Sequence, residues 1–249
     1  MTAPATPPRD GETLDTFYRG RIRVLQKKAG YRFSVDAPLL ADFIRIGPED
    51  EALELGTGTG IISLLLSVRP FRRIVAVELQ EGLADLARRN VELNGLPDRI
   101  EIVQADLRTF EPGRKFDLIF SNPPYIRRST GFLSASAEKS AAKHELHGGI
   151  GDVLGKTAEW LAPWGRACFV YPEKRRAEFL AAAGESGLGG RRLRFVQPRA
   201  EEPPNLFLIE LGRTGEQDTA SEKLEIMAPL ILFGPDGKYT AATEAIFAG

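Results

Sequence analysis

Short apolar runs alternate with helix-like stretches along most of this chain, and this alternation limits the possible folds more than any other feature. The runs expected to form strands cover residues 52–55, 74–77, 100–103, 116–120 and 167–171, with two closing strands at 193–196 and 206–211. The stretches between these runs have apolar residues at helical spacing, for example at positions 83, 86, 87 and 91. Strands that alternate with helices predict a mostly parallel, seven-stranded sheet with helices on both faces, an α/β fold.

The expected helices and turns have their own signals. Apolar residues at 39, 40, 43 and 44 follow helical spacing after Asp36 and predict a short helix that ends near residue 47. Residues 61–68 are apolar on nearly every face, so we expect this helix to be buried. A further helix is expected around 154–161, a turn at 163–165, and an appended strand and turn at 230–239.

Length and composition favour a single folded domain. The chain has 249 residues, of which 43% are hydrophobic and 27% charged, as in an ordinary α/β domain with a sizeable core. Residues 1–14 are rich in proline, threonine and alanine and are expected to form a disordered tail. Residues 15–213 are expected to hold the domain, and residues 214–249 a linker and a terminal strand and turn.

Two features bear on the compartment. No apolar run reaches the roughly 18 to 20 residues of a membrane span, and the first residues lack the order of a secretory signal. We therefore expect a cytoplasmic protein without a membrane partner. The chain has a single cysteine, Cys168, so an intrachain disulfide and a cysteine-based zinc site are excluded. Because Cys168 lies in an apolar run, we expect its thiol to be buried.

Charge is distributed unevenly along the chain. The net charge of −1 and the pI near 6.2 do not indicate a nucleic-acid-binding protein. Between residues 18 and 33, however, the chain carries no acidic residue and six basic ones, which are Arg19, Arg21, Arg23, Lys27, Lys28 and Arg32. A locally basic face can bind phosphates while remote acidic residues cancel the total, although a solvated basic segment explains the same charges.

The first predicted strand runs into a glycine-rich turn that contains Gly56, Gly58 and Gly60. Glycines let the backbone turn tightly and approach a ligand, and the helix that follows offers unpaired N–H groups, so such a turn is typical of sites for nucleotide-like cofactors. A dinucleotide site needs a third glycine three positions after the second, where this chain has Ile61. With Glu54 just before the first glycine, the turn resembles the first motif of the S-adenosylmethionine-dependent methyltransferases.

Two further acidic residues lie at the ends of the next predicted strands. Glu78 ends the second strand, where a carboxylate can accept hydrogen bonds from both hydroxyls of a ribose. Asp106 follows the third strand, where the methyltransferase resemblance implies contact with the adenine of the cofactor. Because parallel strands end at the same edge of a sheet, we expect both carboxylates and Glu54 to gather around one molecule of S-adenosylmethionine.

The motif Asn122-Pro123-Pro124-Tyr125 follows the fourth predicted strand. It resembles the motif of methyltransferases that act on planar nitrogens, namely adenine N6, cytosine N4, guanine N2 and the glutamine amide. Such a nitrogen is a poor nucleophile because its lone pair is delocalised, and the Asn122 side-chain oxygen and the carbonyl after it can accept its two hydrogens as the new bond forms. The prolines stiffen the loop, and the Tyr125 ring can stack on the base. The cofactor carries its own leaving group, so no metal is required.

Three further segments narrow the choice among the four possible substrate nitrogens. Residues 30–40, Lys143-His144-Glu145 and residues 230–240 resemble the valine tRNA adenine-N6 methyltransferase family, and the resemblance runs from about residue 17 to 245. It implies a class I, Rossmann-like methyltransferase fold, cofactor contact at Asp36, and methylation of the adenine on the 3′ side of the anticodon. With tRNA as the partner, the basic residues at 19–28, Pro124 and Tyr125 become candidate substrate contacts, and His144 and His147 could touch RNA or phosphate.

Alternative functions remain open at this point. A glutamine-N5 methyltransferase of release factors uses the same Asn-Pro-Pro-Tyr loop, but those enzymes normally carry a helical domain before the cofactor domain, and only about fifty residues precede Glu54 here. An amino-group methyltransferase of rRNA or DNA has the same chemistry. A non-catalytic cofactor-binding subunit that recruits RNA has little reason to keep the amide of Asn122. The oligomeric state does not follow from the sequence.

Overall fold

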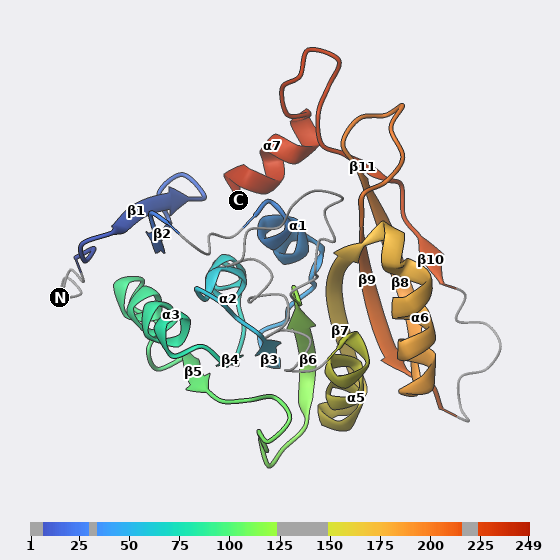
Figure 1. Cartoon of the computed structure of the whole chain (residues 1–249), viewed down its shortest axis with the longest axis horizontal. Coiled ribbons are helices and arrows are strands. Elements are labelled where there is room, and N and C mark those ends of the chain that lie inside the picture. Colours follow the sequence, from blue (N-terminus) through green and yellow to red (C-terminus); the bar gives the residue numbers. More distant parts are fainter. Residues whose placement is uncertain (1–6, 30–33, 124–148, 216–223) are drawn as a thin grey trace, which may run out of the picture.

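A computed structural model describes residues 7–29, 34–123, 149–215 and 224–249. Its centre is a mostly parallel sheet with the strand order β10-β8-β9-β7-β6-β3-β4-β5, in which β11 also pairs with β8 (Figure 1). The long strands are β3 (Glu51–Leu55), β4 (Arg73–Glu78), β5 (Ile100–Gln104), β6 (Phe116–Ser121), β7 (Leu161–Pro172), β8 (Leu188–Gln197) and β9 (Leu206–Arg213). Among these, only β9 runs antiparallel to its neighbours. The predicted seven-stranded α/β sheet is confirmed, and the short strands β10 (Glu225–Ile226) and β11 (Leu230–Ile231) extend it along β8.

Helices cover both faces of this sheet (Figure 1). One face carries α1 (Asp36–Phe43), α2 (Ile61–Leu66), α3 (Glu81–Leu93) and α7 (Ala241–Ala248), and the other carries α5 (Ile150–Trp160) and α6 (Arg176–Glu185). Strand residues alternate between the two cores because side chains alternate across a sheet. In β3, for example, Ala52 packs in the first core and Leu53 in the second. The expected apolar stripe of α3 is buried as well.

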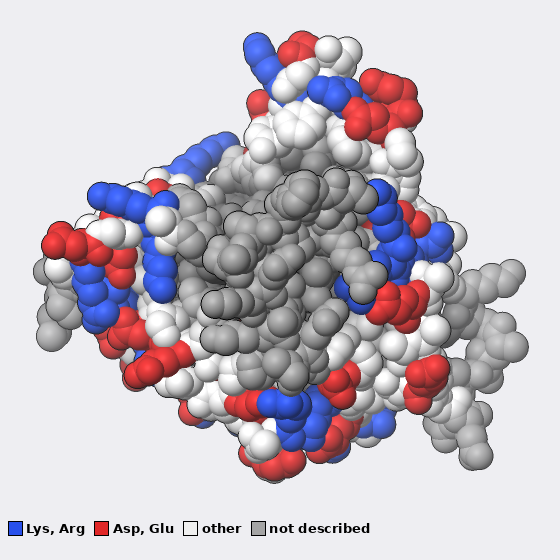
Figure 2. Space-filling view, viewed as in Figure 1, with Lys and Arg blue, Asp and Glu red and all other residues white. Residues whose placement is uncertain are grey.

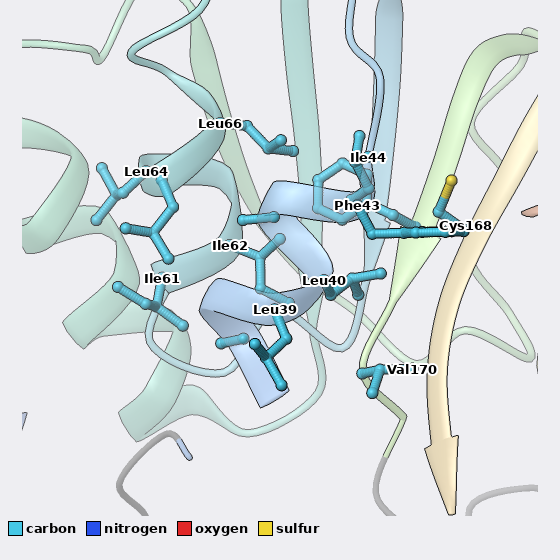
Figure 3. Packing of buried hydrophobic residues seen from close by; sticks show 14 of the residues in the cluster. Leu39, Leu40, Phe43, Ile44, Ile61, Ile62, Leu64, Leu66, Cys168 and Val170 are labelled. Carbon is cyan, nitrogen blue, oxygen red and sulfur yellow. The ribbon is translucent and has the colours of Figure 1, made fainter. Parts of the chain in front are cut away.

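Cys168 lies in the first core, beside the Phe43 and Ile44 side chains at the end of α1 (Figure 3). The thiol is fully buried, and burial raises its pKa to about 12, so it stays protonated at neutral pH. The prediction of a buried cysteine is confirmed.

The segment before the domain forms a hairpin that the sequence analysis missed. Strand β1 (Glu12–Phe17) pairs antiparallel with β2 (Ile22–Lys27) in a separate two-stranded sheet that packs on α3. Residues 12–14, expected to belong to a disordered tail, pair with residues 25–27, so that expectation was wrong for them. The Arg89 guanidinium of α3 holds the start of the hairpin through an ion pair with Glu12, in which both side chains are largely buried.

The C-terminal extension also contains an element that the sequence pattern did not indicate. After β11 and the predicted turn, the chain forms α7, whose first turn is capped by the Thr240 hydroxyl accepting from the Thr243 N–H. Helix α7 packs against α1, and Gly249 lies so close to the Tyr18 ring that a side chain at position 249 would overlap it. The C-terminus of the chain therefore lies against the turn between β1 and β2.

The remaining differences from the expected elements are local. Helix α2 ends at Leu66, two residues earlier than expected, and α6 was not expected at all. The turn expected at 163–165 is a bulge within β7, because the pairing with β6 jumps from Leu161 to Arg166 while β6 advances only from Phe116 to Leu118. Within the described residues, no helix is long and apolar enough to cross a membrane.

Candidate functional site

The site residues expected at the strand ends lie at one edge of the sheet because β3, β4, β5 and β6 are parallel neighbours whose carboxyl ends coincide. Hydrogen bonds join these ends directly. The Ser121 hydroxyl at the end of β6 donates to the Leu55 carbonyl at the end of β3, over 2.7 Å. The N–H groups of Gly56 and Thr57 donate to the Val77 carbonyl of β4. The loops that leave these strands therefore start from fixed positions.

The glycine loop, residues 56–60, depends on backbone conformations that other residues rarely adopt. Gly56, Gly58 and Gly60 have φ angles of 70°, 60° and 81°. A Cβ at Gly56 would meet nothing within 4 Å, so the backbone there is open to a close approach, whereas a Cβ at Gly60 would touch Ala87 of α3. The first glycine thus leaves room for a ligand, and the last allows α3 to pack closely.

Glu54 braces the glycine loop from inside the protein. Its carboxylate is buried and accepts hydrogen bonds from the hydroxyls of Thr57, over 2.6 Å, and Ser63, over 2.5 Å. Burial raises the pKa of Glu54 to about 7, although both hydroxyl donors act in the opposite direction. Thr57 and Ser63 were not among the expected site residues, and their hydroxyls at three and nine positions after Glu54 are the signal that could have found them.

Glu78 lies directly beside this loop. Its two carboxylate oxygens accept from the Gly58 N–H and the Gln80 N–H, each over 2.9 Å. Burial raises the pKa of this carboxyl above its ordinary value, while the two backbone N–H groups lower it. The structure therefore brings Glu78 and the middle of the glycine loop together, as the sequence predicted.

Asp106 lies one strand further along, after β5. It forms an ion pair with Arg108, which is more exposed. A cavity of about 380 Å³ begins at the next residues, and its walls are Leu107, Arg108 and the α5 residues Gly151, Asp152 and Lys156, together with Val153, Gly155 and Glu159. Asp36 lies elsewhere, at the buried start of α1, which packs against α2 just after the glycine loop.

Asn122 and Pro123 follow Ser121 and are half-buried and buried, respectively. Since Ser121 is tied to Leu55, the two residues leave the sheet next to the strand that leads into the glycine loop. Pro124, Tyr125, His144, His147 and Arg32 lie outside the described residues, so the structure does not place these expected contacts.

The basic residues of the hairpin differ from one another. Arg19, Arg21, Lys27 and Lys28 are exposed, whereas Arg23 is half-buried and its guanidinium donates to the Leu93 carbonyl of α3. The Lys27 amine lies beside Gly82 in the first turn of α3, near the end of β4. On the face shown in Figure 2, basic and acidic side chains lie in separate small groups, so no continuous basic band crosses the described part of it.

The residues present fit an S-adenosylmethionine molecule at this edge. The open backbone at Gly56 and the buried Glu78 carboxylate lie together, and the buried Thr59 hydroxyl has no hydrogen-bond partner within the part of the chain that the structure describes. A buried polar atom of this kind is costly unless a ligand or another group satisfies it. A loop with these properties suits a polar cofactor.

Comparisons with known proteins agree with this arrangement. Residues 52–134 match a family described as a methyltransferase domain. A tRNA1(Val) (adenine(37)-N6)-methyltransferase from Flavobacteriaceae bacterium (strain 3519-10) is 31% identical over 193 residues, which is 77% of this chain and 81% of the relative. A relative of the same name from Cronobacter sakazakii is 27% identical and covers 99% of both chains. A predicted O-methyltransferase from Agrobacterium tumefaciens has a TM-score of 0.65 at 21% identity, over 85% of this chain and 94% of its own, and supports the fold alone.

Proposed function

This chain is an S-adenosylmethionine-dependent methyltransferase of the tRNA1(Val) (adenine(37)-N6)-methyltransferase family, and from that premise we propose that it methylates N6 of the adenine on the 3′ side of the anticodon in a valine tRNA. The observation that carries the proposal is the position of Asn122. It follows β6 at the edge where Ser121 is bonded to Leu55, next to the glycine loop. An amide at this place can receive an amino nitrogen close to the methyl donor.

The proposed chemistry needs two hydrogen-bond acceptors and a methyl donor. Bound S-adenosylmethionine supplies the methyl group on a sulfonium, which leaves as a neutral thioether. The Asn122 side-chain oxygen and the Pro123 carbonyl accept the two hydrogens of N6, which holds the nitrogen lone pair toward the donor as charge develops. One of these protons then passes from the nitrogen to water. Pro124 and Tyr125 complete the loop in this proposal, with the ring of Tyr125 stacked on the base.

Cofactor binding is assigned to the residues gathered at the sheet edge. Glu78 is the acceptor for the ribose hydroxyls, and it already accepts from the Gly58 N–H, so its position is tied to the glycine loop. Asp106 is assigned to the adenine, with the cavity beyond Leu107 beside it. Glu54 acts through the loop rather than on the cofactor, because both of its hydroxyl donors belong to the loop and α2. Asp36, at the buried start of α1, is the remaining assigned residue.

The hairpin is assigned to the tRNA backbone. Arg19 and Arg21 are exposed at its turn, and Lys27 and Lys28 are exposed at its other end. Phosphate contacts position a nucleic acid without reading its sequence, so these side chains would set affinity and the asparagine loop would select the base. Arg23 contributes to this surface through the packing of the hairpin, since its guanidinium is bonded to Leu93.

Methyl transfer from labelled S-adenosylmethionine tests the function. The substrates are an unmodified valine tRNA transcript, the same transcript with guanine at position 37, ribosomal RNA, and release-factor protein. We expect label only in the first, recovered as N6-methyladenosine after nuclease digestion. Label in ribosomal RNA or in a glutamine side chain, with none in the tRNA, would overturn the proposal.

A further inference from the structure

Two asparagines hold the hairpin by its backbone, Asn90 within α3 and Asn94 at the C-cap of the same helix. The Asn94 side chain accepts from the Arg23 N–H, over 2.9 Å, and donates to the Arg23 carbonyl, over 2.7 Å. In the same way, the Asn90 side chain accepts from the Leu25 N–H, over 2.6 Å, and donates to the Leu25 carbonyl, over 3.1 Å. Alternate residues of an antiparallel strand direct their backbone N–H and C=O groups away from the partner strand. The two asparagine amides bind these groups on the outer edge of β2, as the backbone of a further strand would.

Asn90 makes a further contact that Asn94 does not. Its amide nitrogen also donates to the Thr59 carbonyl, over 2.9 Å, between Gly58 and Gly60 in the glycine loop. The third hydrogen bond of Asn94 goes to the Asn90 carbonyl, within α3 itself. Asn90 is fully buried, so its amide links the hairpin and the loop without competition from water.

We propose that Asn90 is a positioning residue for cofactor binding, which fixes the glycine loop through the Thr59 carbonyl and couples that loop to the basic hairpin. The inference rests on the proposed use of the glycine loop for S-adenosylmethionine. If Asn90 served only to attach the hairpin, its side-chain contacts outside α3 would end at Leu25, as those of Asn94 outside α3 end at Arg23. The bond to Thr59 instead sets the path of the backbone between two glycines with positive φ angles, which have no side chains of their own to fix them.

Asn94 supplies a matched control for this proposal. Asn90 lies in the last turn of α3 and Asn94 is the C-cap residue that follows the helix, and each makes two hydrogen bonds to one residue of β2. Asn90→Ala and Asn94→Ala therefore both weaken the attachment of the hairpin, but only Asn90→Ala releases the glycine loop. We expect both variants to lower the melting temperature.

Calorimetric titration of the full-length variants with S-adenosylmethionine, without RNA, separates the two roles. We expect the Kd to rise about tenfold or more in Asn90→Ala and less than threefold in Asn94→Ala. Equal affinities in the two folded variants would overturn the proposal. Failure of wild-type binding would instead count against the proposed cofactor site, so the two failures are distinguishable.

Amide hydrogen exchange of the wild-type chain gives a test that does not depend on a variant folding. S-adenosylhomocysteine at saturating concentration should slow exchange of the Leu25 amide, which donates to Asn90, at least threefold more than exchange of the Arg23 amide, which donates to Asn94. Equal slowing of both amides would show only general stabilisation by the ligand and would overturn the proposal.

Discussion

The glycine loop and the β1–β2 hairpin both contact α3, but different kinds of groups hold them. The loop is fixed by the ends of parallel strands and by buried carboxylates, with Glu54 below it and Glu78 beside it. The hairpin lies outside the main sheet and is attached by side chains of α3, while its charged groups at positions 19, 21, 27 and 28 remain exposed. The first region has little freedom to adjust to a ligand, whereas the second presents flexible cationic side chains to a large partner.

This difference predicts where substitutions act. A group in the rigid region should affect cofactor binding or the chemical step by a large factor, because the surrounding backbone cannot rearrange to replace it. A group on the exposed hairpin should affect the affinity for RNA by a small increment, because each phosphate contact is partly screened by salt and is one among several.

The largest effect is expected at Asn122. Replacing Asn122 with alanine removes an aimed acceptor that matters most when charge develops on the attacking nitrogen, so turnover should fall by about a hundredfold or more. Affinity for S-adenosylmethionine and the melting temperature should stay close to wild type. Single-turnover methylation of the valine tRNA measures the rate. A near-normal rate would break the comparison, because the rigid edge would then contain no group needed for the reaction.

The buried carboxyl of Glu54 predicts a pH dependence of stability. Its pKa in the folded protein is about 7, above the ordinary value of 4.5, so its contribution is fully present below pH 4.5 and is lost as the pH rises through 7. Glu54→Gln removes the ionisation and keeps an acceptor for the two hydroxyls. The free energy of unfolding of this variant, relative to that of wild type, should therefore rise by about 2 to 3 kcal/mol between pH 5 and pH 8.

Urea unfolding of both proteins across that pH range measures the gain. If the difference in free energy of unfolding between Glu54→Gln and wild type did not change with pH, the carboxyl under the loop would stay ionised in the folded protein. The glycine loop would then be held by a buried charge rather than by a neutral, hydrogen-bonded acid.

Replacing Glu78 should weaken cofactor binding by a free energy similar in size to the stability change predicted for Glu54→Gln. Glu78→Ala removes the proposed ribose acceptor and also leaves the Gly58 N–H without its present partner, so affinity for S-adenosylmethionine should fall by about 1.5 to 3 kcal/mol. Glu81→Ala, at an exposed position in the first turn of α3, is the matched control and should bind normally. Calorimetry that finds unchanged affinity in a folded Glu78→Ala protein would remove Glu78 from the cofactor site.

The sequence predicted the rigid region better than the hairpin, and the reason is physical. Strands β3 to β6 are short apolar runs with acidic or amide residues at their ends, and the parallel arrangement then brings Glu78 and Asn122 to one edge. The hairpin pairs an acidic strand with a basic one and has no continuous apolar run, and two asparagine side chains satisfy the outer edge of β2. The two asparagines responsible lie 65 and 71 positions away along the chain from the residues that they bind, so local pattern does not reveal them.

Helix α7 escaped prediction for a related reason. Its sequence of eight residues is rich in alanine but lacks a clear apolar stripe, and it is fixed by a threonine cap and by packing against α1. The hydrogen-bond partners of Glu54 were also not foreseen. An acid next to a glycine turn suggests a ligand contact, whereas the structure directs its carboxylate to Thr57 and Ser63. Packing against α1 decided the first outcome, and two nearby hydroxyls decided the second.

The smallest effects are expected from single charges on the hairpin. Arg19→Gln, Arg21→Gln and Lys28→Gln each remove one exposed cation that the proposal places near tRNA phosphates. Each should reduce the slope of log Kd for tRNA against log salt concentration by about 0.7 to 0.9, the value for one released counterion, and should leave turnover at saturating tRNA unchanged. Filter-binding titrations between 50 and 200 mM salt, roughly the range over which such slopes are resolved, measure the change.

Arg73→Gln provides the control for this last prediction, because Arg73 starts β4 at the amino edge of the sheet, opposite the site, and is paired with Glu101. It should leave the slope unchanged. If the three hairpin variants also left it unchanged, the tRNA would lie elsewhere on the protein. If instead they lowered turnover as strongly as Asn122→Ala, the hairpin would belong to the rigid region, and the division between a fixed cofactor edge and an adjustable RNA-binding surface would be wrong.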